Sequence, residues 1–285
     1  MKNPDSEFLE QVTSSIFGLA FIAHCAGVRV SKLGTVDDPI LEIIGACADF
    51  NMKLGSSDIW ALFSHFIREY PFGEFAGWRN YSHHLDETQG HLSLVWLKLQ
   101  KAVDIGAFAG PFDPAHQVVL ATNLQKMNLS SDRTSIWEQD DPSAWWTTPR
   151  AVFSLQRPAP ELANLALDDA VPQPDAWNHL EFSNLDPNEI LEVQDLQGWV
   201  ALVEEFPSRI NVTNTECWEN NSSRLTPSVM VPDWAWVATK YVGVHLTPAA
   251  FLALSYCLIP IAKGEFSLIA GWSPGATYWL PKVTR

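Results

Sequence analysis

Tryptophan is concentrated in the second half of this chain, where ten of the thirteen tryptophans follow residue 130. Several lie in short aromatic phrases at residues 144–149 (AWWTTP), 232–236 (PDWAW) and 277–280 (TYWL). The indole is the largest side chain, and its N–H needs a hydrogen-bond partner once it is buried. The second half therefore folds around either an unusually aromatic core or a cleft lined by flat side chains with polar edges.

The first 130 residues carry a different pattern, with apolar positions recurring at helical spacing. Acidic residues followed by proline, at Asp38-Pro39 and Asp113-Pro114, are typical of helix starts. This pattern predicts helices around residues 8–23, 40–52, 58–70, 84–103 and 114–127. Because the connections between them are short, we expect an antiparallel helical bundle over residues 1–130.

The polar stretch at residues 128–132 marks a change to short β-type runs bounded by Pro, Gly, Asn or Asp. Strands are predicted at 134–138, 145–148, 151–155, 190–193, 210–212, 242–246, 267–271 and 277–280. Helices are predicted among them at 196–205, 232–240 and 248–258. The chain is thus expected to be α+β, with the helical bundle followed by a tryptophan-rich mixed α+β domain at 131–285.

Charge and hydropathy narrow the class of protein. The net charge is −15, and the 18 basic residues form no block, so binding to a nucleic-acid backbone is not expected. The sequence shows no signal-peptide pattern and no apolar run long enough to cross a bilayer, which predicts a cytoplasmic protein with free cysteines. An acidic surface of this kind would suit a basic protein partner.

The common catalytic and phosphate-binding motifs are missing, including G-x-S-x-G, Walker A, G-x-G-x-x-G and H-E-x-x-H. His83, Glu87 and His91 would share one face of a helix, and these residue types can bind zinc or iron. No second helix offers a matching Glu-x-x-His motif, which a metal site in a bundle would need. We therefore expect a solvated helix face there and no metal.

The remaining chemistry lies on the predicted strands of the second half. Alternation along 241–247 places His245 and Thr247 on the same face as Gly243, whose missing side chain permits close approach of a backbone or a ligand. Trp279 follows a tight turn that brings it near Trp272. This pattern is compatible with two roles for His245, a hydrogen-bonded structural histidine or a ligand-binding one.

The order of these phrases resembles a family of uncharacterised bacterial cytosolic proteins. It runs from Trp-Trp-Thr-Thr-Pro through Pro-Asp-Trp and Val-His-Leu-Thr to a terminal Gly-Trp-x-Pro-x-x-Thr-Tyr-Trp-Leu. The C-terminal part of that family is reminiscent of the ADP-ribosyltransferase superfamily, and the resemblance covers about residues 133–282. In that superfamily a first-strand Arg or His, a Ser/Thr-rich second strand and a late Glu hold NAD.

The resemblance implies a set of site residues. Arg133 would be the first-strand cation, and Thr147 and Thr148 would form the hydroxyl strand beside Trp146. Trp279 and Thr247 would add further contacts to NAD, with His245 as a catalytic residue. The late acid is missing from its expected position, which Gly275 occupies. Glu265, on the preceding strand, is the acid that could take its place.

Two functions follow as expectations. The first is an NAD-handling, ADP-ribosyltransferase-like protein that is catalytically degenerate if Glu265 does not replace the missing acid. The second is a non-enzymatic, acidic interaction module, antitoxin-like or a phage-encoded inhibitor, in which tryptophans anchor a basic partner.

Overall fold

The computed structural model describes only part of the chain: residues 18, 20, 21, 24, 112–113, 117–120, 147–149, 151, 153–155, 177–180, 186–211, 228–255 and 259–280. Contacts divide the chain into two compact units, Met1–Gly110 with Glu216–Ser223 and Pro111–Thr215 with Arg224–Arg285. In the first unit the described residues are helical, and Ala20 and Phe21 are buried. The rest of the predicted bundle and the predicted boundary at residue 130 lie outside the described residues.

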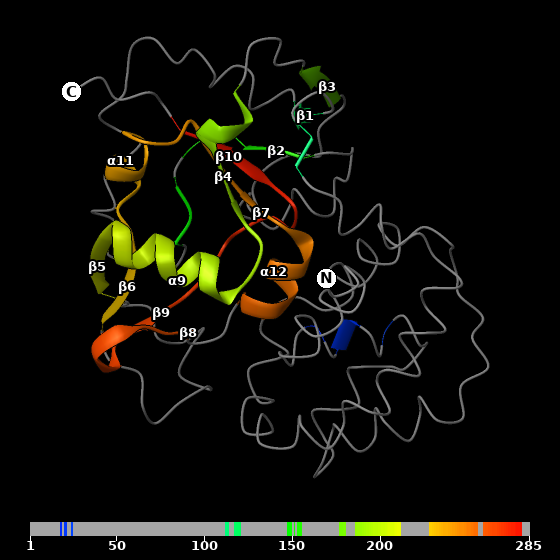
Figure 1. Cartoon of the computed structure of the whole chain (residues 1–285). Helices are drawn as coiled ribbons and strands as arrows, with labels where there is room; N and C mark the ends of the chain where they lie inside the picture. The colour runs from blue at the N-terminus through cyan, green and yellow to red at the C-terminus, as the bar shows by residue number, and fades with distance from the viewer. Residues whose placement is uncertain are drawn as a thin grey trace, which may run out of the picture. The chain divides into compact units, whose positions relative to one another are not determined.

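The described strands of the second unit form three sheets (Figure 1). The first is an antiparallel pair of β1 (Gln117–Leu120) and β3 (Trp177–Leu180). The second has the order β2 (Phe153–Ser154), β10 (Thr277–Trp279), β7 (Gly243–Leu246) and β4 (Ile190–Val193). The third has the order β5 (Pro207–Asn211), β6 (Ser228–Pro232), β9 (Phe266–Ser267) and β8 (Ile259–Pro260).

Helices are interleaved with these strands, as expected for an α+β unit. Among the described residues of this unit, the α-helices are α9 (Leu196–Glu205), α11 (Trp234–Val237) and α12 (Pro248–Leu254), and the 3-10 turns are η4 (Pro187–Glu189) and η5 (Ala262–Gly264). Asp195, Asp233 and Thr247 cap the three α-helices by accepting hydrogen bonds from backbone N–H groups of the first turn. α9 has the predicted bounds, whereas α11 and α12 are shorter than predicted.

Two predictions on described residues are wrong. The helix predicted at 114–127 is instead a strand over Gln117–Leu120, because Val118, Val119 and Leu120 favour a sheet and the backbone pairs with β3. Thr147 and Thr148 do not belong to a strand. Thr147 is held by hydrogen bonds to the backbone of Ala270 instead of by a regular ladder.

Three tryptophans form the centre of the aromatic core. The ring centroids of Trp199, Trp234 and Trp272 are 5.9–6.4 Å apart, and all three side chains are buried. Their indole N–H groups donate to Ser267 Oγ at 2.9 Å, Thr147 O at 3.0 Å and Ala276 O at 3.3 Å respectively. These tryptophans therefore pack as core with their polar edges satisfied, which is the structural alternative posed by the sequence.

α9 packs against both of the larger sheets. It contacts β5 and β6 of one sheet, β4 of the other, and α12 (Figure 1). Trp199, Leu202 and Val203 supply its buried face. Among the helices of the described residues, none combines the length and the apolar character that a bilayer crossing requires.

Candidate functional site

A row of polar side chains crosses one face of the β2-β10-β7-β4 sheet. The strand register places Ser154 opposite Thr277, Thr277 opposite His245, and His245 opposite Glu192. Directly paired residues on neighbouring strands project to the same face. We call Ser154, Thr277, His245 and Glu192 the polar row. Its first three members are at most 1% exposed, and Glu192, on the edge strand β4, is half-buried.

His245 has an unsatisfied ring nitrogen at the centre of the polar row. Its Nδ1 lies 2.9 Å from Thr277 Oγ1, whereas its Nε2 is buried and has no hydrogen-bond partner within the described part of the chain. Burial lowers the pKa of His245 from 6.5 to about 3, so the ring is neutral at pH 7. A neutral imidazole presents one donor and one acceptor, so Nε2 is open to whichever group complements its tautomer.

Trp279 lies beside His245 on the same face, two residues after Thr277. Its indole N–H donates to Ser154 Oγ at 2.8 Å, and the Ser154 hydroxyl donates to Gln117 Oε1 at 2.6 Å. A Cβ at Gly243, the partner of Trp279 on β7, would lie 3.3 Å from the indole ring. The missing side chain of Gly243 therefore permits the close approach of Trp279, as expected for a glycine within a strand.

Phe112 lies against both aromatic members of this face. Its ring centroid is 5.3 Å from that of His245 and 6.1 Å from that of Trp279. Its backbone N–H donates to Glu192 Oε1 at 3.3 Å. Nearby, the Gln117 side-chain amide donates to Asp113 O at 2.6 Å. Residues from β1 and the segment before it therefore complete the surroundings of the polar row.

The predicted site residues Thr147, Thr148 and Thr247 have structural hydrogen bonds. Thr147 Oγ1 accepts from Ala270 N at 2.9 Å, and the Thr148 hydroxyl bonds to Tyr278. Tyr278 alternates with Thr277 and Trp279, so Thr148 lies on the side of the sheet opposite to the polar row. Thr247 follows β7 and caps α12 by accepting a hydrogen bond from Ala250 N at 3.1 Å.

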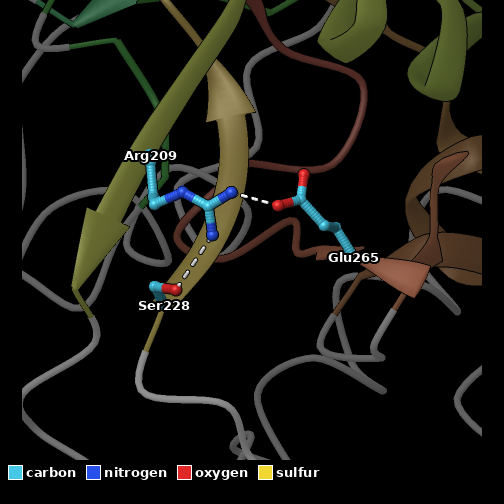
Figure 2. Close-up of polar contacts among 3 residues, drawn as sticks. All are labelled: Arg209, Ser228 and Glu265. Atoms are coloured by element: carbon cyan, nitrogen blue, oxygen red, sulfur yellow. Dashed lines mark hydrogen bonds and ion pairs between the residues drawn. The ribbon is translucent and has the colours of Figure 1, made fainter. Parts of the chain in front are cut away.

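Glu265 lies beside the β5-β6-β9-β8 sheet, whereas His245 lies in the β2-β10-β7-β4 sheet. Glu265 precedes β9 and forms an ion pair with Arg209 of β5, whose guanidinium also donates to Ser228 Oγ at 3.2 Å (Figure 2). The Arg209 and Glu265 side chains are 51% and 33% exposed. The structure therefore does not bring together the two residues predicted to be catalytic.

The other candidates cannot be placed. Arg133 and Trp146 lie outside the described residues, as does the helix face of His83, Glu87 and His91. In the described ranges, no group of three or more His, Cys, Asp or Glu side chains is arranged to hold a metal ion.

Sequence reasoning missed several residues of the site: Ser154, Thr277, Glu192, Gln117 and Phe112. Alternation alone could have added Thr277, since it lies two residues before Trp279. The others depend on pairing between strands far apart in the sequence, such as β2 with β10 and β4 with β7.

Comparisons with known protein families, with curated proteins and with solved structures give no match.

Proposed function

We propose that the second unit binds NAD through its nicotinamide end at the polar row, without transferring ADP-ribose. The observation that carries this proposal is the buried Nε2 of His245, which lacks a partner in the described structure and lies beside Trp279. Leaving a buried polar atom unsatisfied costs about 1–3 kcal/mol, and a ligand that supplies the missing hydrogen bond recovers part of this cost.

The chemistry of the polar row suits a nicotinamide group. A carboxamide contains both a donor and an acceptor, so it can complement either tautomer of a neutral His245. Its flat ring can pack against the indole of Trp279, and aromatic pairs of this kind contribute about 0.5–1.5 kcal/mol beyond the area they bury. At the edge of the row, the acidic side chain of Glu192 would favour the cationic ring of NAD⁺ over a neutral or anionic ring.

We infer binding without transfer from the position of the one acid that the resemblance implies. Transfer chemistry of this kind uses a carboxylate to stabilise the positively charged sugar centre. Glu265, the acid that the resemblance leaves available, pairs with Arg209 on the other sheet. Gly275 occupies the position expected for the acid itself. This arrangement supports a degenerate member of an NAD-handling group.

Isothermal titration of the purified chain with NAD⁺, nicotinamide and ADP-ribose tests the proposal. We expect heat from NAD⁺ and nicotinamide, and at least tenfold weaker binding of both by His245→Gln. Glu265→Gln is the matched control and should bind as the unaltered chain does. Thermal melts verify that each variant is folded. Absence of binding by the folded, unaltered chain to both NAD⁺ and nicotinamide would rule the proposal out.

A second function, contact with a basic protein partner, is favoured by one observation. Trp236 of α11 is 43% exposed on a chain whose net charge is −15, and exposed tryptophans are frequent anchors of interfaces. A pull-down at low salt should then recover a partner that is lost at high salt, and Trp236→Ala should weaken its capture. Recovery unchanged by both salt and Trp236→Ala would argue against this function.

A further inference from the structure

Phe112 lies where a flat ligand would be expected to contact the polar row. The site offers two aromatic surfaces on adjacent strands, His245 of β7 and Trp279 of β10, and the Phe112 ring contacts both. The plane of the Phe112 ring is tilted by 49° to the ring of His245 and by 60° to the ring of Trp279. Such contacts are those that a nicotinamide ring would make.

We infer that Phe112 is an internal substitute for the ligand ring and that it must leave the polar row before NAD⁺ binds. This inference rests on the proposed function and adds its regulation. The Phe112 ring cannot satisfy His245, because a hydrocarbon ring leaves Nε2 without a hydrogen bond. A nicotinamide group would replace the ring contacts and also supply the missing bond.

The burial pattern supports displacement of Phe112 instead of movement of the sheet. His245 is 1% exposed and lies within a four-stranded sheet, whereas Phe112 is half-buried and precedes β1. Phe112 therefore lies outside the sheet that contains His245. The Phe112 ring can move away from His245 while the strands of that sheet stay paired.

The attachment of Phe112 also depends on the same side chains that the ligand would use. Its backbone N–H donates to Glu192 Oε1 at 3.3 Å, at the end of the row that would favour a cationic ring. Asp113, the next residue, is tied through its carbonyl to Gln117, which in turn bonds to Ser154 of the row. Occupation of the row by a ligand would thus compete with contacts that hold the segment closed.

The consequence for affinity can be stated as a population effect. When only a fraction of molecules has the row open, the apparent dissociation constant is the intrinsic one divided by that fraction. If about one molecule in ten is open, removing the Phe112 ring should strengthen binding by about tenfold.

Titration of the full chain, Phe112→Ala and Phe266→Ala with nicotinamide and NAD⁺ tests this inference. Phe266 is the matched control, because it is partly buried on β9 of the other sheet. Binding strengthened about tenfold by Phe112→Ala, and unchanged by Phe266→Ala, supports the inference. Equal or weaker binding by Phe112→Ala overturns it while leaving the proposed function intact if the unaltered chain binds. If neither the unaltered chain nor Phe112→Ala binds, the proposed function fails, and the inference fails with it.

The amide resonance of Phe112 provides a readout that does not depend on affinity. Saturating nicotinamide should break its hydrogen bond to Glu192 and shift the resonance upfield by NMR. A resonance unchanged while nicotinamide binds would show that Phe112 stays in place, which contradicts the inference.

Discussion

The neutral, buried His245 makes stability depend on pH in a way that can be calculated. Its pKa is about 3 in the folded chain, whereas the ordinary value of 6.5 applies once the chain unfolds. Between these values the unfolded state binds a proton that the folded state does not, so the free energy of unfolding falls as the pH falls. The contribution of His245 is complete above pH 6.5 and is lost progressively down to pH 3. From pH 7 to pH 5 the loss amounts to about 2 kcal/mol.

Urea unfolding at pH 7, 6 and 5 measures this loss in the unaltered chain and in His245→Gln. The other titrating groups are common to both proteins, so their contributions cancel in the comparison. We expect the unaltered chain to lose about 2 kcal/mol more than the variant over this range. A difference below about 0.5 kcal/mol would mean that His245 is protonated as readily in the folded state as in the unfolded one, and would refute this account of its burial.

Three further predictions concern the packing around the site. Gly243→Ala should destabilise the fold by about 1–3 kcal/mol in urea, because its Cβ presses on the anchored ring of Trp279; an unchanged midpoint would contradict this. Trp199→Phe should cost about 2–4 kcal/mol through a cavity and a lost hydrogen bond, whereas Trp236→Phe at the surface should cost less than about 0.5 kcal/mol; similar urea midpoints for the two would count against the assigned core. Glu265→Gln should change stability by less than about 1 kcal/mol, since its ion pair is exposed, and a larger loss on thermal melting would reveal an unrecognised role.

Local signals predicted much of the second unit because those signals are strong there. α9 begins after Asp195 and ends before Pro207, so a capping residue and a proline define its bounds in the sequence. β4 is likewise predictable from local sequence, because it is a short, mostly apolar run that directly follows the η4 turn. The α+β class of this unit is confirmed for these reasons.

The errors arise where pairing at long range decides the structure. Residues 117–120 follow a helix-start signal, Asp113-Pro114, but become a strand because β3, about 60 residues later, pairs with them. The short run at 145–148, bounded by Pro149, predicts a strand that includes Thr147, yet hydrogen bonds to Ala270 hold Thr147 outside any regular ladder. Local propensity cannot report either partner.

The site shows the same division between local and distant information. Alternation places His245 on a face with Gly243, and the aromatic phrase contains Trp279, so the sequence alone proposes both as candidates. Their neighbours Ser154 and Glu192 come from the two outer strands of the sheet, and only the strand order places them in one row. Sequence order places Glu265 just before the last motif, but sequence order does not show that its side chain pairs with Arg209 of β5.

We propose above that the polar row binds the nicotinamide group through His245 Nε2. NMR of the chain labelled with ¹⁵N in its histidine rings follows that atom directly during a titration with nicotinamide at pH 7. If nicotinamide binds there, we expect a saturable change in the Nε2 resonance of His245, with the ring remaining neutral. We also expect His245→Gln to lose nicotinamide binding. A Nε2 resonance that does not move at saturating nicotinamide would contradict the claim.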